Sequence, residues 1–252
     1  QAPMSYPALL SWCKKKAEQF APYITDTGNY IAVALSNHQK VVLEAQLGAM
    51  RDIDYGIFPY TSSSSTISAY GPIGAGIPGT LPDHIVGVLK AYSTCVGAGP
   101  FTAEKAMPEK WMESLRKSGG EYGAATGRPR RVGPFDAVAS AYGLKCQNAD
   151  KIALTKLDVL SRMDEIPVIT AYKLNDELIT EFDPLDDLDS MTPVIQTLPG
   201  WNTDISKCRK YEELHENARK YIETLEHLLN HEIQFISVGA ERNQYLTKGE
   251  WL

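Results

Sequence analysis

The clearest amphipathic pattern in the chain lies in residues 211–229. Apolar side chains recur there at spacings of three and four residues, at Leu214, Ala218, Tyr221, Ile222, Leu225 and Leu228. This period places them on one face of a helix, so we predict a helix that covers a sheet. In residues 7–20, Leu9, Cys13 and Phe20 share one face, which predicts a second covering helix. Further helices are predicted at residues 30–37, 82–88, 109–117 and 135–144.

Short apolar or β-branched runs predict strands at residues 41–43, 86–92, 152–154, 168–172 and 235–237. Helix and strand patterns overlap at residues 86–88. Because strand and helix signals alternate, we expect an α/β fold with a mainly parallel sheet flanked by helices. Two segments lack these patterns: residues 62–79 are rich in Ser, Gly and Pro, and residues 183–189 are acidic. We interpret the acidic segment as a solvated loop.

The charge balance excludes one broad class of function. The 252 residues contain 25 Lys and Arg against 31 Asp and Glu, a formal net charge of −6. Nucleic-acid binding needs a basic face to neutralise phosphates, so we expect no nucleic-acid partner. No apolar run approaches the roughly 20 residues of a membrane-spanning helix, so we expect no membrane partner.

The four cysteines lie far apart, at Cys13, Cys95, Cys146 and Cys208, without a Cys-x-x-Cys pair. This spacing favours reduced, buried thiols over disulfides or metal ligands, and with it a cytoplasmic location.

The most informative short string is Thr155-Lys156-Leu157-Asp158, directly after the predicted strand at residues 152–154. In parallel sheets, ligands gather at the carboxyl ends of strands. A carboxylate there can accept two hydrogen bonds from the edge of guanine, which adenine cannot supply. The alternative is that Asp158 simply caps the next helix.

A second string, at residues 123–131, combines small residues with Arg128, Arg130 and Arg131. Small residues let a loop approach a ligand closely, and guanidinium groups suit carboxylates and phosphates. The alternative is a solvated basic loop. Residues 44–56, followed by the hydroxyl-rich residues 59–66, and residues 237–240 after the final strand are weaker candidates for nucleotide contacts, because such loops are also simply flexible.

Taken in order, these strings resemble the adenylosuccinate synthetase family. The similar blocks are Asp52 to Pro59, Lys90 to Pro100, Thr126 to Arg131, Thr155 to Leu160 and Leu198 to Trp201. The resemblance runs from about Pro7 to the C-terminus. It implies a P-loop-NTPase-like adenylosuccinate synthetase fold and a homodimeric ligase of purine (AMP) biosynthesis. In the implied reaction, GTP phosphorylates the 6-oxygen of IMP with the help of Mg²⁺, and L-aspartate then displaces the phosphate.

The resemblance also implies roles for individual residues. The implied GTP contacts are Arg130, Lys156, Leu157, Asp158, Ser237, Val238 and Gly239. The implied IMP contacts are Ser62, Val96, Arg128 and the position of Leu47. The implied aspartate contacts are Ala124, Ala125, Thr126, Gly127, Arg128, Pro129 and Arg130.

The chain departs from the family pattern in four places. Leu47 stands where the family has a glutamine, with Gln46 one place early, and Ala125 replaces one of two threonines. Ala240 replaces a common proline, a minor change. The family's glycine-rich phosphate loop, with its catalytic base and a nearby histidine, has no counterpart in the sequence.

We therefore expect residues 1–252 to be a C-terminal portion of the enzyme, an incomplete fold without a separate second domain. We expect no catalytic residue in this chain, Mg²⁺ ligands mostly outside it, and no activity from it alone. The alternative is a stand-alone, non-catalytic nucleotide-binding module derived from the same fold.

Overall fold

The structure is a computed structural model and describes residues 3–249. It divides into two compact units: residues up to 44 together with 70–81, and residues 45–69 together with those from 82 onward. In the described part, no helix combines the length and the apolar character needed to cross a membrane.

The first unit is helical. It contains α1 (Tyr6–Phe20), a 3-10 turn (Ala21–Tyr23), α2 (Thr27–Ser36) and α3 (Tyr70–Gly74). Asp26 caps α2 by accepting a hydrogen bond from the Asn29 N–H. The helices predicted at residues 7–20 and 30–37 are thus confirmed, with shifted ends for the second.

Two predictions for this unit are wrong. The described residues of α1 and α2 include none that is buried, so Leu9, Cys13 and Phe20 do not form a covering face. Residues 41–43 form exposed coil instead of a strand, and Val42 is 89% exposed. In both cases the pattern identifies apolar positions but says nothing about a partner to bury them.

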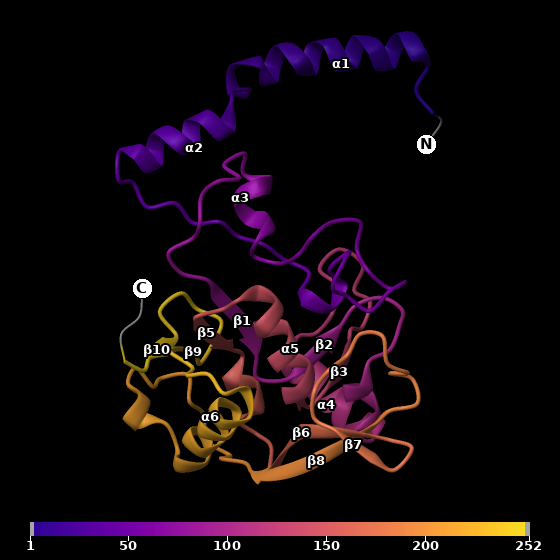
Figure 1. The fold of residues 1–252 in the computed structure, drawn as a ribbon, viewed down its shortest axis with the longest axis vertical. Coiled ribbons are helices and arrows are strands. Elements are labelled where there is room, and N and C mark those ends of the chain that lie inside the picture. The colour runs from indigo at the N-terminus through magenta and orange to yellow at the C-terminus, as the bar shows by residue number, and fades with distance from the viewer. Residues whose placement is uncertain (1–2, 250–252) are drawn as a thin grey trace. The chain divides into compact units, whose positions relative to one another are not determined.

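A four-stranded sheet forms the centre of the second unit. It contains β1 (Val86–Lys90), β5 (Lys151–Thr155), β9 (Phe235–Ser237) and β10 (Tyr245–Thr247), in the order β1-β5-β9-β10. β1, β5 and β9 are parallel, and β10 is an antiparallel edge strand (Figure 1). The carboxyl ends of the three parallel strands therefore lie at one edge of the sheet.

Three helices pack in this unit: α4 (Glu109–Gly119), α5 (Ala137–Gln147) and α6 (Glu216–Leu229). α6 buries the face predicted for it, with Ala218, Tyr221, Ile222 and Leu225 fully enclosed. This face shares one core cluster with Ile152 and Leu154 of β5 and Ile236 of β9, which confirms the predicted covering role.

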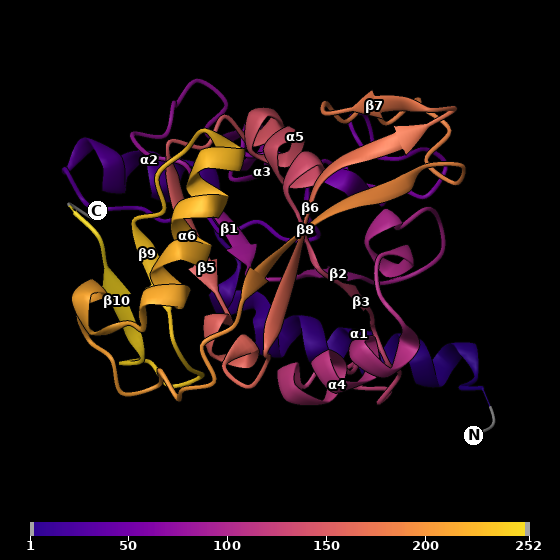
Figure 2. The same ribbon diagram turned by 90° about the horizontal axis from the view of Figure 1, so that it is seen from below.

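The remaining strands of the described residues form a second four-stranded sheet and a two-stranded sheet. β4 (Phe135–Asp136) pairs in parallel with β6 (Glu165–Leu174), and β6 pairs antiparallel with β7 (Glu177–Ile179) and β8 (Thr192–Pro199). The views of Figure 2 and Figure 1 both show β6 and β8 as adjacent long ribbons. β2 (Ser93–Cys95) and β3 (Arg131–Gly133) form an antiparallel pair.

The short connections include 3-10 turns at Ala49–Arg51, Thr102–Lys105, Leu157–Leu160 and Tyr211–Glu213. The helix predicted at residues 82–88 is wrong, because the backbone from Val86 onward pairs with β5. The helix predicted from residue 135 begins at Ala137, after the short strand β4. All four cysteines are free, as predicted, but Cys13 is exposed and the other three are only partly buried.

Candidate functional site

The two strings that resemble guanine-binding motifs meet at the carboxyl edge of the central sheet. Thr155 is the last residue of β5, and Lys156 and Asp158 follow it. Ser237 is the last residue of β9, and the parallel register pairs Leu154 with Ile236. Segments that lie 80 residues apart in the chain therefore end side by side.

The segment after β9 is tightly folded. The Ser237 hydroxyl donates to the Gly239 carbonyl at 3.0 Å, and the buried Val238 N–H donates to the Gln244 carbonyl at 2.9 Å. A Cβ on Gly239 would meet the side-chain amide of Gln244, so a larger residue here would require that flexible side chain to move. The geometry fixes the backbone beside the end of β5.

The segment after β5 is anchored by Leu157 and Leu160, which are buried below it. Lys156 has φ = 61°, and its Nζ donates to the Gly119 carbonyl at 2.6 Å. The Asp158 carboxyl is partly buried, and its pKa is raised, chiefly because burial disfavours the charged form. A guanine edge that donates two hydrogen bonds would restore polar partners to this carboxylate.

Glu121 connects this segment with the arginine-containing loop, and sequence analysis did not single it out. Its side chain is fully buried and accepts hydrogen bonds from Lys90 Nζ at 2.9 Å, Tyr92 OH at 2.7 Å and Arg130 Nη1 at 2.8 Å. Lys156 Nζ lies 3.7 Å away. Burial pushes the pKa of Glu121 up, but these hydrogen bonds outweigh it and hold the pKa at about 2. The carboxylate is therefore charged at neutral pH.

The loop implied to bind aspartate is an exposed turn on a fixed stem. Within it, the Gly127 N–H donates to the Gly123 carbonyl, and the Gly123 N–H donates to the Arg128 carbonyl, both at 2.8 Å. The turn leaves Ala124, Ala125, Thr126, Gly127, Arg128 and Pro129 exposed. The three arginines grouped by the sequence have separate surroundings: Arg128 is exposed, Arg130 binds Glu121, and Arg131 binds Glu104.

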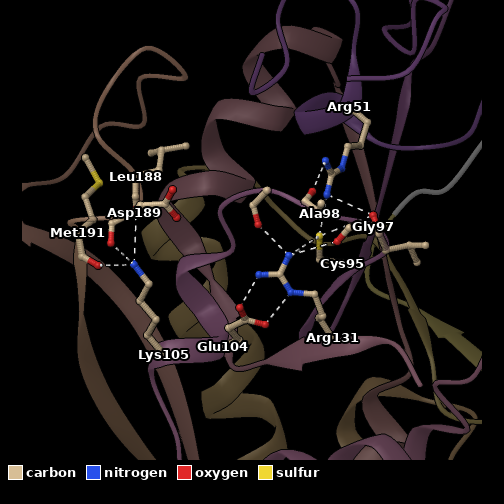
Figure 3. A network of polar contacts seen from close by, with 12 residues as sticks. Arg51, Cys95, Gly97, Ala98, Glu104, Lys105, Arg131, Leu188, Asp189 and Met191 are labelled. Carbon is tan, nitrogen blue, oxygen red and sulfur yellow. Dashed lines mark hydrogen bonds and ion pairs between the residues drawn. The ribbon is translucent and has the colours of Figure 1, made fainter. Parts of the chain in front are cut away.

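Two arginines organise the segment that contains Val96 (Figure 3). Arg51 donates to the carbonyls of Tyr60, Val96 and Ala98 and to Cys95 Sγ at 2.9 Å. Arg131 pairs with Glu104 and donates to the carbonyls of Gly97 and Gly99. Residues 95–99 are thereby held between the turn at Ala49–Arg51 and the strand β3.

Two of the positions implied to contact IMP, Ser62 and Val96, are bonded to Arg51. The Ser62 N–H donates to the Arg51 carbonyl at 2.8 Å, so Arg51 links the backbone at Ser62 to that at Val96. The side chain of Val96 is 70% exposed and that of Leu47 is 57% exposed. Arg51, which sequence analysis did not assign, is thus the organising residue of this region. Its sequence signal is its place within residues 44–56, directly before the Asp52 block.

The described residues offer no evident metal centre. Across residues 3–249, no group of three or more His, Cys, Asp or Glu side chains is arranged to hold a metal ion. The donor set that Mg²⁺ prefers is oxygen from carboxylates and phosphates. No residue of the described part is assigned as a Mg²⁺ ligand.

Comparison with known proteins gives one consistent result. The family model described as adenylosuccinate synthetase matches residues 1–246. An adenylosuccinate synthetase from Carboxydothermus hydrogenoformans is 41% identical over 95% of this chain and 56% of its own length. One from Pelotomaculum thermopropionicum is 38% identical over 98% of this chain and 58% of its own length.

A solved structure agrees with the sequence relatives. The fully ligated adenylosuccinate synthetase from Plasmodium falciparum superimposes with a TM-score of 0.89 at 35% identity. The match covers 95% of this chain and 57% of that one. The chain spans little more than half the length of these relatives, and its α/β fold is theirs over that span. The chain belongs to the adenylosuccinate synthetase family.

Proposed function

We propose that this chain carries the guanine, IMP and aspartate contacts of an enzyme that joins IMP and L-aspartate to form adenylosuccinate in purine biosynthesis. The family membership supports the reaction class. As parts of the same proposal, the family likeness also favours a homodimer and a cytoplasmic location.

The proposed reaction has two steps. The 6-oxygen of IMP takes the γ-phosphoryl group of GTP while N1 of IMP loses its proton, which gives 6-phosphoryl-IMP, GDP and a proton. The amino group of aspartate then forms a C–N bond at C6 of the purine while the bond from C6 to the phosphorylated oxygen breaks. Inorganic phosphate and a proton leave. Phosphorylation turns a poor leaving oxygen into a good one. The contribution proposed for this chain is the positioning of reactants, on which phosphoryl transfer depends.

The shared edge of β5 and β9 is the observation that carries the proposal. Lys156, Leu157 and Asp158 follow one strand, and Ser237, Val238 and Gly239 follow its parallel neighbour. We propose that Asp158 accepts from the guanine edge while Ser237 and Gly239 close the pocket. Arg130 is proposed to lie at the ribose of GTP.

IMP and aspartate are proposed to bind on the neighbouring loops. Ser62 would offer its hydroxyl to IMP, near Val96 and the position of Leu47. The exposed turn at residues 124–130 would hold the aspartate carboxylates through the N–H groups of residues 124–126 and the Arg128 side chain, which would also reach IMP. Exposed N–H groups and a free guanidinium suit a dicarboxylate.

Calorimetry on the 252-residue chain tests the base preference. We expect GDP to bind at least about 100-fold more tightly than ADP, because a site built for the guanine edge leaves polar groups unpaired with adenine. IMP should bind without displacing GDP. Equal affinity for GDP and ADP would contradict the guanine assignment.

An activity assay separates the proposal from its alternative. We expect no adenylosuccinate from IMP, GTP and aspartate with this chain alone, and formation of it when the segment present in full-length relatives is supplied. Tight GDP binding without restored turnover would favour a binding module instead.

A further inference from the structure

Glu121 is a buried charge at which its own segment meets three other segments of the chain. Its partners are Lys90 at the end of β1, Tyr92 just beyond it, Arg130 at the stem of the exposed turn, and Lys156 after β5. The proposed function gives roles to Lys156 and Arg130 and none to the carboxylate between them.

The two carboxylate oxygens divide these partners. Oε2 accepts from Arg130 at 2.8 Å. Oε1 accepts from Lys90 at 2.9 Å and Tyr92 at 2.7 Å, and Lys156 Nζ lies 3.7 Å from it. A carboxylate has about four acceptor positions, so this side chain can accept from Lys90, Tyr92 and Arg130, while Lys156 adds an ion pair at longer range. One oxygen thus faces the arginine-containing loop and the other faces the strand ends.

The backbone fixes where this carboxylate lies. The Glu121 N–H donates to the Arg116 carbonyl in α4, and the Glu121 carbonyl accepts from the Arg130 N–H, both at 2.9 Å. Lys156 Nζ donates to Gly119, two residues earlier. Lys156 and Arg130 are therefore each bonded twice to the short segment at the end of α4, if the 3.7 Å ion pair is included.

Charge makes this arrangement sensitive to the carboxylate. Three cationic side chains, Lys90, Arg130 and Lys156, surround a single anion that is fully buried. Without the negative charge, the cations would repel one another in a site partly shielded from water. A buried ion pair contributes little net stability compared with an apolar replacement, so its benefit here is the fixed geometry.

We propose that Glu121 is a positioning residue that holds Lys156 and Arg130 in one arrangement, so that a single carboxylate sets both the guanine end and the aspartate end of the site. The assignment of the two ends to guanine and aspartate rests on the proposed function, whereas the contacts of Glu121 with Lys156 and Arg130 do not.

Hydrogen exchange on the free chain tests the holding without any ligand. We expect Glu121→Gln to speed exchange at least about tenfold in both residues 122–131 and residues 155–160, with β6 unchanged. Glu113→Gln is the matched control in the preceding helix α4, because Glu113 is exposed and its ion pair is with Lys117 on the same helix. Acceleration in neither segment, in only one, or uniformly along the chain would overturn the proposal.

A double-mutant cycle tests the consequence for binding. We expect Glu121→Gln and Lys156→Met each to weaken GDP binding about tenfold, and the effect of the first to shrink in the background of the second. Strictly additive effects would contradict action through Lys156. If the unmodified chain does not bind GDP, the guanine assignment fails, while the exchange experiment still decides the role of Glu121.

Discussion

At the scale of single residues, the site depends on side chains in costly surroundings. Lys156 occupies a left-handed backbone conformation, Asp158 is partly buried, and Glu121 is fully buried. Such conformations and buried charges persist only where neighbouring contacts hold them, and they gather at functional sites. The neighbours here are the Gly119 carbonyl and the ring of donors around Glu121.

The base preference can be reversed at Asp158. Asp158→Asn should weaken GDP binding by about 100-fold or more, because the amide replaces one of the two acceptor oxygens with an NH₂ donor that cannot pair with the guanine donors. The same variant should bind xanthosine diphosphate better than the unmodified chain does, since the amide N–H₂ can donate to the 2-oxygen of xanthine. Calorimetry with GDP and with xanthosine diphosphate measures this change in base preference. IMP affinity is the control, and an equal loss for IMP would refute the assignment.

Asp136 gives a pH-dependent prediction outside the site. Burial raises its pKa to about 6, although hydrogen bonds from the Ala139 N–H and the Tyr172 hydroxyl oppose the shift. Between about pH 4 and pH 6, the Asp136 carboxyl is therefore protonated in the folded chain but ionised in the unfolded chain. The free energy of unfolding declines as pH rises through this window, with the slope expected for about one proton.

Asp136→Asn removes this titration and keeps a good helix cap. The free energy of unfolding of the Asn variant, relative to the unmodified chain, should increase between about pH 4 and about pH 7. Urea denaturation of both proteins at the two pH values measures it. If the two proteins differed in free energy of unfolding by the same amount at both pH values, Asp136 would keep its ordinary pKa.

At the scale of elements, sequence patterns predicted those helices and strands whose apolar residues repeat with a regular period. α6 was predictable because six apolar residues keep one face over several turns. Residues 41–43 were mistaken for a strand because three apolar residues define no period and reveal no partner. β7 and β10 were missed because three residues define no period, and β8 was missed because most of its residues are exposed and its partner β6 is set only by the fold.

The candidate site follows the same rule. Strings next to strand ends, such as Lys156 to Asp158, were found because motif and location agree. Glu121 was not, since its four partners lie up to 35 residues away from it in the chain, on both sides, and only the fold assembles them. Arg131 was grouped with its neighbours, but strand β3 turns it toward Glu104.

The buried face of α6 can be tested by removing one side chain. Leu225 is completely buried, so Leu225→Ala should lower the free energy of unfolding by about 2–5 kcal/mol through lost burial and a cavity. Lys220→Ala, on the exposed face, removes only a surface pair with Glu216 and should cost less than about 1 kcal/mol. Chemical denaturation of the two variants should separate them, and equal losses would contradict the assignment of the faces.

At the scale of the whole molecule, the two units differ in kind. The unit containing the sheet has an extended apolar core, whereas α1 and α2 contain no buried residue among those described. Most of a helix's stability in a protein comes from packing an apolar face, and short helices without it are marginal. The two units should therefore resist opening to very different degrees.

Hydrogen exchange at neutral pH measures this difference. Amides in α1 and α2 should exchange at least about 100-fold faster than those in β5, which opens only with the core. The measurement uses the intact chain, with peptides from residues 6–36 and 151–155. Comparable protection in the two regions would show that the helices are packed against something in solution.

The hydrogen bond from the Tyr221 hydroxyl to the Ala91 carbonyl, at 2.6 Å, joins residues 130 positions apart. β1 likewise pairs with a strand 65 residues later, and β9 follows only at residue 235. Long loops must close before such contacts form, so we expect this topology to fold slowly. During synthesis, the proposed guanine pocket has no second wall until residue 237 has been added. A guanine nucleotide therefore cannot guide the early folding of the nascent chain and can stabilise only its finished form.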